Sequence, residues 1–466
     1  MFMTKEERLG SGPLGPLIFE MVIPAVIAQL VNVLYSIVDR IYIGHMEGVG
    51  REALTGVGVC FPILMLISAF SAFAGMGGAP RAAISLGRGE HKMAERILGN
   101  AVLMLFGFSL ILTVFFSVYK KPLLMAFGAS SNTIGYSLDY LDIYLLGTIF
   151  VQFSLGLNMF ITCQGQAKIS MISVMLGAGS NIILDPFFIF GLGMGVRGAA
   201  LATIISQALS CIWILSFLCS SRSSIRIRME NLVPDRKILG SIAALGIAPF
   251  VMQSTESLVT IVLNSGLQRY GGDLYVGTIT IMQSVMQLII VPLQGVQQGT
   301  QPVISYNFGA GNKERIKKTM YYSFSMIFSG TLLSCLATCI FPEFFASFFT
   351  TDQELIALVG KVMPVFMGGI WMFGIQLVCQ SAFMGMGQAG ISLFLALLRK
   401  IFLLIPLALV LPKYFGVYGI YYAEPIADIL APAITGILFL SLFSKIIEKE
   451  AKSRMGEKYY KKNIKS

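Results

Sequence analysis

Long apolar stretches alternate with short polar segments along the whole chain of 466 residues. Apolar stretches of about twenty residues are typical of helices that cross a membrane. The chain contains twelve of them, so we predict an all-α integral membrane protein with twelve transmembrane helices. The predicted spans are roughly 15–44, 53–79, 94–118, 133–162, 169–190, 196–219, 239–266, 274–300, 316–341, 355–384, 390–411 and 416–444.

The second half of the chain repeats landmarks of the first half. Residues 80–89 recur 222 positions later as residues 302–311, and Gln166 recurs as Gln388. Six spans per copy is an even number, so both copies enter the membrane from the same side and form a parallel repeat about a pseudo-two-fold axis. The expected divisions are an N-lobe at 1–220 (spans 1–6), a cytoplasmic linker at 221–238, a C-lobe at 239–444 (spans 7–12) and a basic cytoplasmic tail at 445–466.

The composition supports a membrane protein and indicates its orientation. Hydrophobic residues make up 55% of the chain and charged residues 12%, and the short connections leave no room for a soluble catalytic domain. With both termini in the cytoplasm, 24 Lys and Arg residues lie inside and six lie outside, as the positive-inside rule requires. The net charge of +10 therefore reflects topology, and we predict no nucleic-acid partner. The two histidines, His45 and His91, lie in loops, and no nucleophile–base motif occurs in the spans, so we predict no enzyme activity.

A polar stripe on the first span ends at a carboxylate. Gln29, Asn32, Ser36 and Asp39 follow one another at steps of three or four residues, which places them on one face of a helix. A carboxylate at a helix centre costs ~3 kcal/mol to insert, so it usually faces a cavity or a partner. The neighbouring Arg40 points about 100° away around the helix and is a poor partner.

The fifth span carries Asn181 and Asp185 one turn apart on one face, and Thr203 of the sixth span meets them if sequential helices pack together. Three interpretations stay open for these residues together with Asp39. They form a hydrogen-bonded clamp between helices, a carboxylate pair that takes up a proton because two close like charges do not both ionise cheaply, or an oxygen-rich site for sodium.

The second half has a different set of charges. Glu256 lies on the seventh span in a stripe that echoes the first span, and Glu424 and Asp428 lie on the last span. Arg399 and Lys400 lie in the middle of the eleventh span, close enough to pair with these acids. Glu256 is open to a functional or a structural role, whereas for Glu424, Asp428 and Arg399 we favour a structural role.

Two further polar stripes have alternative interpretations. Glutamines on the eighth span suggest either hydrogen bonds between helices or a water-filled path, which we favour. Tyrosines on the fourth span suggest either an interfacial aromatic belt, which we favour, or a wall that binds cations. The stripes are Gln283, Gln287, Gln294, Gln298 and Gln301, and Tyr136, Tyr140 and Tyr144.

Several of these motifs together resemble the multidrug and toxic compound extrusion (MATE) family. The local sequence around Asp39-Arg40 is most similar to the MepA-like bacterial branch of that family. The motifs are Ile23-Pro24, Val38-Asp39, the run 181–186, the run 195–203 and the run 301–311. The resemblance implies an antiporter with an outward-facing V of two six-helix lobes. It also implies a coupling-cation site at Asp39, Asn181, Asp185 and Thr203, and substrate-lining amides at Asn32 and Asn158.

We therefore predict a multidrug efflux antiporter of the bacterial inner membrane that exports amphipathic organic cations in exchange for protons or sodium. The alternative is a lipid-linked precursor flippase of the same superfamily, which would need several cationic groups in its cavity. We expect a monomer in the lipid bilayer with both termini in the cytoplasm, no resident metal ion and no cofactor besides the coupling ion. The predicted substrate-binding residues are Gln29, Asn32, Ser36, Asn158, Glu256, Gln283 and Gln287.

Overall fold

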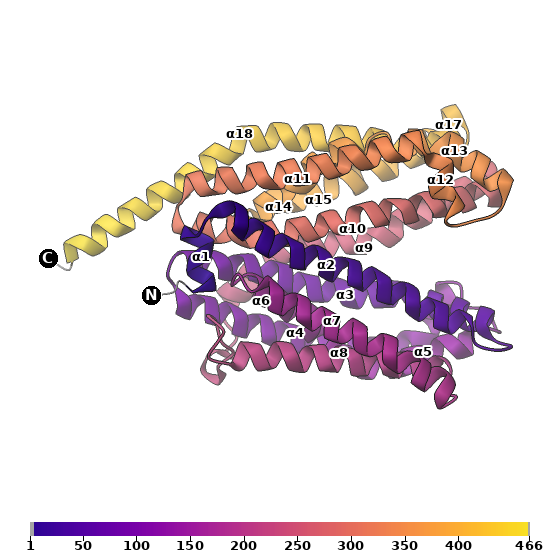
Figure 1. The fold of residues 1–466 in the computed structure, drawn as a ribbon, viewed down its shortest axis with the longest axis horizontal. Helices are drawn as coiled ribbons and strands as arrows, with labels where there is room; N and C mark the ends of the chain where they lie inside the picture. The colour runs from indigo at the N-terminus through magenta and orange to yellow at the C-terminus, as the bar shows by residue number, and fades with distance from the viewer. Residues whose placement is uncertain (1–3, 465–466) are drawn as a thin grey trace.

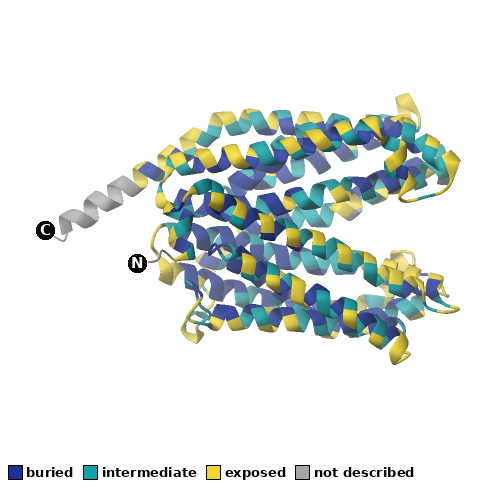
Figure 2. Ribbon diagram, in the orientation of Figure 1, coloured by how far each residue is buried: buried dark blue, intermediate teal, exposed yellow. Residues whose placement is uncertain are grey.

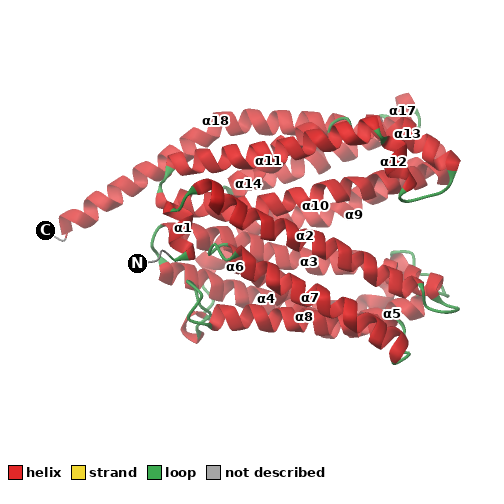
Figure 3. Cartoon of the chain, in the orientation of Figure 1, coloured by secondary structure: helices red, strands yellow, loops and turns green. Residues whose placement is uncertain are grey.

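The computed structural model describes the backbone of residues 4–464 and, within that range, all side chains except those of 257, 273 and 454–464. Every regular element in this described range is a helix (Figure 3), which confirms the all-α fold. The elements are α1 (Lys5–Ser11), α2 (Leu14–Gly44), α3 (Gly50–Gly87), α4 (His91–Ala126), α5 (Ile134–Leu146), α6 (Thr148–Thr162), α7 (Ala167–Pro186), η1 (Phe187–Gly191), α8 (Val196–Cys219), η2 (Met229–Asn231), α9 (Arg236–Gly271), α10 (Asp273–Ala310), α11 (Lys313–Ile340), α12 (Pro342–Ser347), α13 (Gln353–Met367), α14 (Ile370–Gly385), α15 (Ala389–Leu397), η3 (Leu398–Leu404), α16 (Ile405–Val410), α17 (Pro412–Phe415) and α18 (Tyr418–Ile464).

The lengths and surfaces of these helices confirm the membrane spans. Within the described residues, ten helices are long and apolar enough to cross a membrane, and two bent helix pairs raise the count to the twelve predicted spans. Exposed positions occur along the outer helices (Figure 2). Many of them are large and apolar, as on α4, where Ile111, Val114 and Val118 are each about two-thirds exposed. A surface of this kind is stable against lipid, whereas in water it would favour association.

The fourth span of each half is bent, which the sequence pattern did not predict. The α5–α6 pair bends by 60° at Gly147, and the α13–α14 pair bends by 44° at Gly368 and Gly369. Gly147 and Gly369 lie 222 positions apart, so the two bends are equivalent in the repeat. A Cβ atom on Gly147 would lie 2.5 Å from the Ile204 side chain, and one on Gly369 would lie 2.8 Å from Asp428 Cβ. Glycine is therefore required at both bends by close packing.

The repeat is also visible where α3 crosses α10. A Cβ atom on Gly87 would overlap the carbonyl oxygen of Tyr306, and one on Gly309 would overlap the carbonyl oxygen of Ile84. Gly87 is equivalent to Gly309, and Ile84 is equivalent to Tyr306. The contact is therefore reciprocal, which is the signature of a two-fold relationship between the halves.

The halves lie side by side, with their helices running along the long axis of the molecule (Figure 1). Elements α1–α8 form one group, α9–α18 form the other, and both termini lie at the same end. The connection between α8 and α9 also lies at that end and contains η2. Gln164 Oε1 accepts hydrogen bonds from Ser223 Oγ at 3.0 Å and from the backbone N–H of Ser224 at 2.7 Å, which fixes the start of this connection. The lobe boundaries at 220 and 239 stay a prediction.

Candidate functional site

Two carboxylates of the first half meet between α2 and α7. Asp39 lies near the end of α2, Asp185 lies in the last turn of α7, and their carboxyl groups are within hydrogen-bonding reach of each other. Asn181 Nδ2, one turn before Asp185, donates to Asp185 Oδ1 at 3.2 Å. Asp185 and Asn181 are buried and Asp39 is half-buried. The structure therefore brings together three of the four residues predicted for the coupling cation, and we call Asp39 and Asp185 the acid pair.

The acid pair has no basic partner among the described residues: none of their ion pairs includes Asp39 or Asp185. The guanidinium of Arg40 instead lies 5.6 Å from the centre of the Phe61 ring. In the described part of the chain Asp39 Oδ1, Asn181 Oδ1 and Asp185 Oδ2 are buried and accept no hydrogen bond. Because buried oxygens without partners are costly, a bound proton or cation would stabilise this arrangement.

Thr203 lies close to the acid pair but is engaged within its own helix, because its Oγ1 donates to the backbone oxygen of Ala199 at 3.0 Å. Tyr140 lies near both Asp39 and Thr203. Tyr140 and Tyr144 are buried and stacked, with ring centres 5.9 Å apart. The prediction of an interfacial aromatic belt is therefore wrong for these two residues, because helix packing turns their shared face inward. Sequence reasoning also missed Tyr35, which lies one turn before Asp39 and near both acids.

The backbone next to Asp185 is irregular. Pro186 has no N–H to donate to the carbonyl of Ile182 one turn earlier, and the π-helix η1 begins at the next residue. Single π-helical turns are often found at functional sites. A carbonyl oxygen without its helical donor beside a carboxylate is a further ligand for a hard cation. The irregular turn therefore lies directly after one member of the acid pair.

A polar cavity of about 130 Å³ lies next to the acid pair, between α2, α6, α7 and α8. The predicted residues on its wall are Gln29, Asn32, Asn158, Asn181 and Thr203. The wall also includes Gln298 from α10 and a group of small or amide side chains that sequence reasoning missed: Ser154, Ser170, Ser173, Ser206, Gln207 and Ser210. The helical spacing of Ser170 and Ser173 on the fifth span, and of Ser206 and Ser210 on the sixth, is the signal that would have found these four. We call this space the amide cavity.

Ser36 and the predicted substrate residues of the second half lie outside the amide cavity. Ser36 Oγ donates to the backbone oxygen of Asn32 at 3.0 Å, so it is engaged within its own helix. Gln283 is half-buried and Gln287 is exposed on α10, and neither lines the cavity. Glu256 lies on α9 with 61% of its side chain exposed, where it pairs with Lys400. The structure does not bring these second-half residues together with the first-half site.

The buried charges of the second half are paired with one another. Arg399 donates from Nε to Asp428 Oδ1 and from Nη2 to Glu424 Oε1, both at 2.6 Å. Its guanidinium also lies 4.3 Å from the centre of the Phe373 ring. Lys400 Nζ pairs with Glu256 and donates to the backbone oxygen of Met252 at 2.9 Å. Both basic residues lie on the π-helix η3. Each of these acids therefore has a basic side chain beside it, unlike the two carboxylates of the acid pair.

Comparison with known proteins agrees with the fold. A family model described as MatE matches residues 24–187 and 249–410, that is, most of both halves. The multidrug export protein MepA of Staphylococcus haemolyticus (strain JCSC1435) is 26% identical over 427 residues, which cover 91% of this chain and 93% of the relative.

Solved structures match over almost the whole chain. An outward-facing conformation of a multidrug resistance MATE family transporter of the MOP superfamily superposes with a TM-score of 0.89, at 24% identity, over 96% of this chain and 99% of that chain. A MOP superfamily transporter from Pyrococcus furiosus, described as having a binding pocket of reverse polarity that suggests a different function, superposes with a TM-score of 0.87. The two sequences are 26% identical, and the match covers 96% of this chain and 99% of that chain.

Proposed function

Because the chain belongs to the MatE family of multidrug efflux transporters, in the MOP superfamily, we propose that it is a secondary antiporter that exports amphipathic organic cations in exchange for protons or sodium ions. The observation that carries this proposal is the acid pair, two carboxylates without a basic partner among the described residues, next to the amide cavity. Asp39 and Asp185 bind the coupling cation, and Asn181 and Thr203 complete its site. The transporter acts as a monomer in the bacterial inner membrane with both termini in the cytoplasm.

Coupling follows if the cation and the substrate favour different arrangements of the two halves. A ligand shifts a conformational equilibrium only by its difference in affinity for the two states. Neutralising the acid pair removes negative charge from the wall next to the amide cavity, so binding of the coupling cation weakens the attraction for a cationic substrate. One charge that crosses 100 mV supplies ~2.3 kcal/mol, which supports a substrate gradient of about several tens-fold.

The lining of the amide cavity favours cations over a lipid-linked precursor. A flippase for such a precursor needs cationic groups to hold its pyrophosphate, and no basic side chain lines this cavity in the described part of the chain. Arg399 is held by Glu424 and Asp428, and Lys400 is held by Glu256. These two cations are therefore neutralised in place and are poor candidates for binding a polyanion.

Drug accumulation in a bacterium that lacks its own efflux pumps tests the proposal. Cells that express the chain should accumulate less of an ethidium-like dye and tolerate a panel of lipophilic cations better than control cells. Asp39→Asn, expressed at the same level, should return accumulation to the control value. Unchanged accumulation and unchanged drug tolerance across the panel would contradict the proposal.

A further inference from the structure

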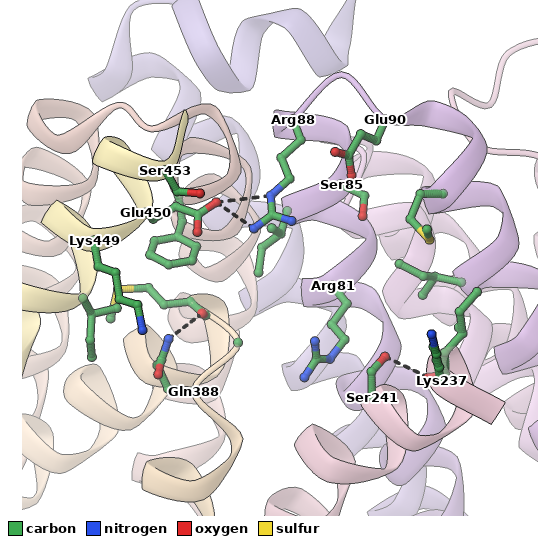
Figure 4. Close-up of a pocket in the computed structure, with 18 residues that line it drawn as sticks. Arg81, Ser85, Arg88, Glu90, Lys237, Ser241, Gln388, Lys449, Glu450 and Ser453 are labelled. Atoms are coloured by element: carbon green, nitrogen blue, oxygen red, sulfur yellow. Dashed lines mark hydrogen bonds and ion pairs between the residues drawn. The ribbon is translucent and has the colours of Figure 1, made fainter. Parts of the chain in front are cut away.

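A second and larger cavity lies at the end of the molecule that carries both termini. It measures about 660 Å³ and is lined by residues of both halves (Figure 4). The first half contributes side chains from α3 and the start of α4, and the second half contributes side chains from α9, the end of α10, α18 and the turn between α14 and α15. We call this space the seam cavity. It is separate from the amide cavity, with which it shares no lining residue.

Basic side chains outnumber acidic ones on the wall of the seam cavity. The basic residues are Arg81, Arg88, Lys237 and Lys449, and the acidic residues are Glu90 and Glu450. Arg88 and Glu450 pair across the seam between the halves at 2.7 Å (Figure 4). The other three basic residues form no ion pair with any described residue, so the wall carries an excess of positive charge.

Arg81 is the deepest of these basic groups. It is half-buried on α3, and its Nε is buried with no hydrogen-bond acceptor in the described part of the chain. A buried guanidinium N–H without an acceptor is costly, because its hydration has been lost and nothing replaces it. Neutral hydrogen-bonding side chains, Ser85, Ser241 and Gln388, line the same wall (Figure 4).

We propose that the seam cavity binds a phosphate-bearing anion, either the headgroup of an anionic phospholipid or free phosphate. A guanidinium presents its N–H groups in a planar fork that fits phosphate oxygens, and flexible lysines neutralise the remaining charge. Basic pockets between transmembrane helices on the cytoplasmic side are a known setting for anionic headgroups. The bound anion accepts from Arg81 on the first half while Lys237 and Lys449 approach it from the second half.

Such an anion would hold the two halves together at this end. Arg81 lies on α3, whereas Lys237 lies on α9 and Lys449 lies on α18. Any movement that separates the halves here would pull these charges away from the anion. A ligand that binds one conformation stabilises that conformation in proportion to its concentration, so the anion favours the state in which this end is closed.

Thermal unfolding of the full chain in nanodiscs tests the proposal without any transport assay. In the first arm, inorganic phosphate is added to nanodiscs of zwitterionic lipid and compared with chloride at equal ionic strength. In the second arm, part of the zwitterionic lipid is replaced with phosphatidylglycerol. At least one of the two arms should raise the melting temperature saturably. Lys237→Gln/Lys449→Gln should lose most of this rise. Both lysines are exposed, so the variant should still fold. Arg81→Lys keeps the positive charge but loses the planar guanidinium. The variant should therefore need a roughly tenfold higher concentration of the anion to reach half of the maximal increase in melting temperature.

The matched control is Lys168→Gln/Lys318→Gln. These lysines are exposed at the same end, one in each half, and neither lines the seam cavity. The control should keep the full rise. A rise with phosphatidylglycerol alone assigns the site to a lipid headgroup, and a rise with inorganic phosphate also assigns it to phosphate itself. No rise from either source in the wild-type chain, or an equal loss in both double variants, would overturn the proposal.

Discussion

Gly87 and Gly309 occupy reciprocal positions at the crossing of α3 and α10, each with its Cα against a backbone carbonyl of the other helix. The same two helices carry the two copies of the repeated motif, so the two sides of this crossing are equivalent in the pseudo-two-fold repeat. Ile84 at this crossing also lines the seam cavity, which lies at the end of the molecule. Both termini are at the same end (Figure 1). The backbones of the two helices are therefore in direct contact at this crossing.

Gly309→Ala and Gly87→Ala should each loosen this crossing. The added methyl group would overlap the carbonyl of Ile84 or of Tyr306, so the helices must separate. Overpacking of this kind typically costs ~1–3 kcal/mol. Thermal unfolding in detergent should show a lower melting temperature for both variants. Gly107→Ala is the control, because nothing lies near a Cβ atom at that position, and it should not lower the melting temperature.

Asp39→Asn and Asp185→Asn should each abolish dye efflux and leave folded protein in the membrane. Each change removes one carboxylate of the acid pair, and the remaining acid loses its partner for sharing a proton or a cation. Glu256→Gln should reduce efflux less, because Lys400 already neutralises Glu256. Efflux from cells with equal amounts of membrane protein measures the effect. An equal loss in all three variants would show that both halves carry the coupling.

Arg399→Met should destabilise the protein strongly. Arg399, Glu424 and Asp428 are all buried, so removal of the guanidinium leaves two carboxylates without their cation. Breaking a buried ion pair on one side typically costs ~3–5 kcal/mol. Arg197→Gln is the control, since the exposed pair of Arg197 with Asp139 should be worth at most about 1 kcal/mol. The triple change Arg399→Met/Glu424→Gln/Asp428→Asn should recover part of the loss. Equal melting temperatures for Arg399→Met and the control would contradict this prediction.

The sequence was sufficient for the spans, the repeat and the acid pair, because each follows from a period or from the cost of a charge in lipid. Asp39 and Asp185 stand out for that reason even though they lie far apart along the chain. The bends at Gly147 and Gly369 were not predicted, since a bent span and a straight span have the same apolar composition. The burial of Tyr140 was also missed, because a helix face shows no sign of whether lipid or another helix covers it. Which acid Lys400 pairs with depends on helix rotation, which composition does not encode.

Protons should drive export at least as well as sodium. Two carboxyl groups within hydrogen-bonding reach of each other do not both ionise cheaply, so one of them should hold a proton that it can exchange. Sodium needs about five or six oxygen ligands by analogy with other hard cations, and the side chains of Asp39, Asn181, Asp185 and Thr203 supply only part of such a shell. The carbonyl of Ile182, freed by Pro186, or water would have to supply the rest.

In sodium-free vesicles that are acid-loaded and contain a trapped pH-sensitive dye, addition of substrate should release protons from the lumen. Asp39→Asn should abolish the signal, and a signal that appears only with a sodium gradient would overturn the assignment to protons while antiport itself would stand.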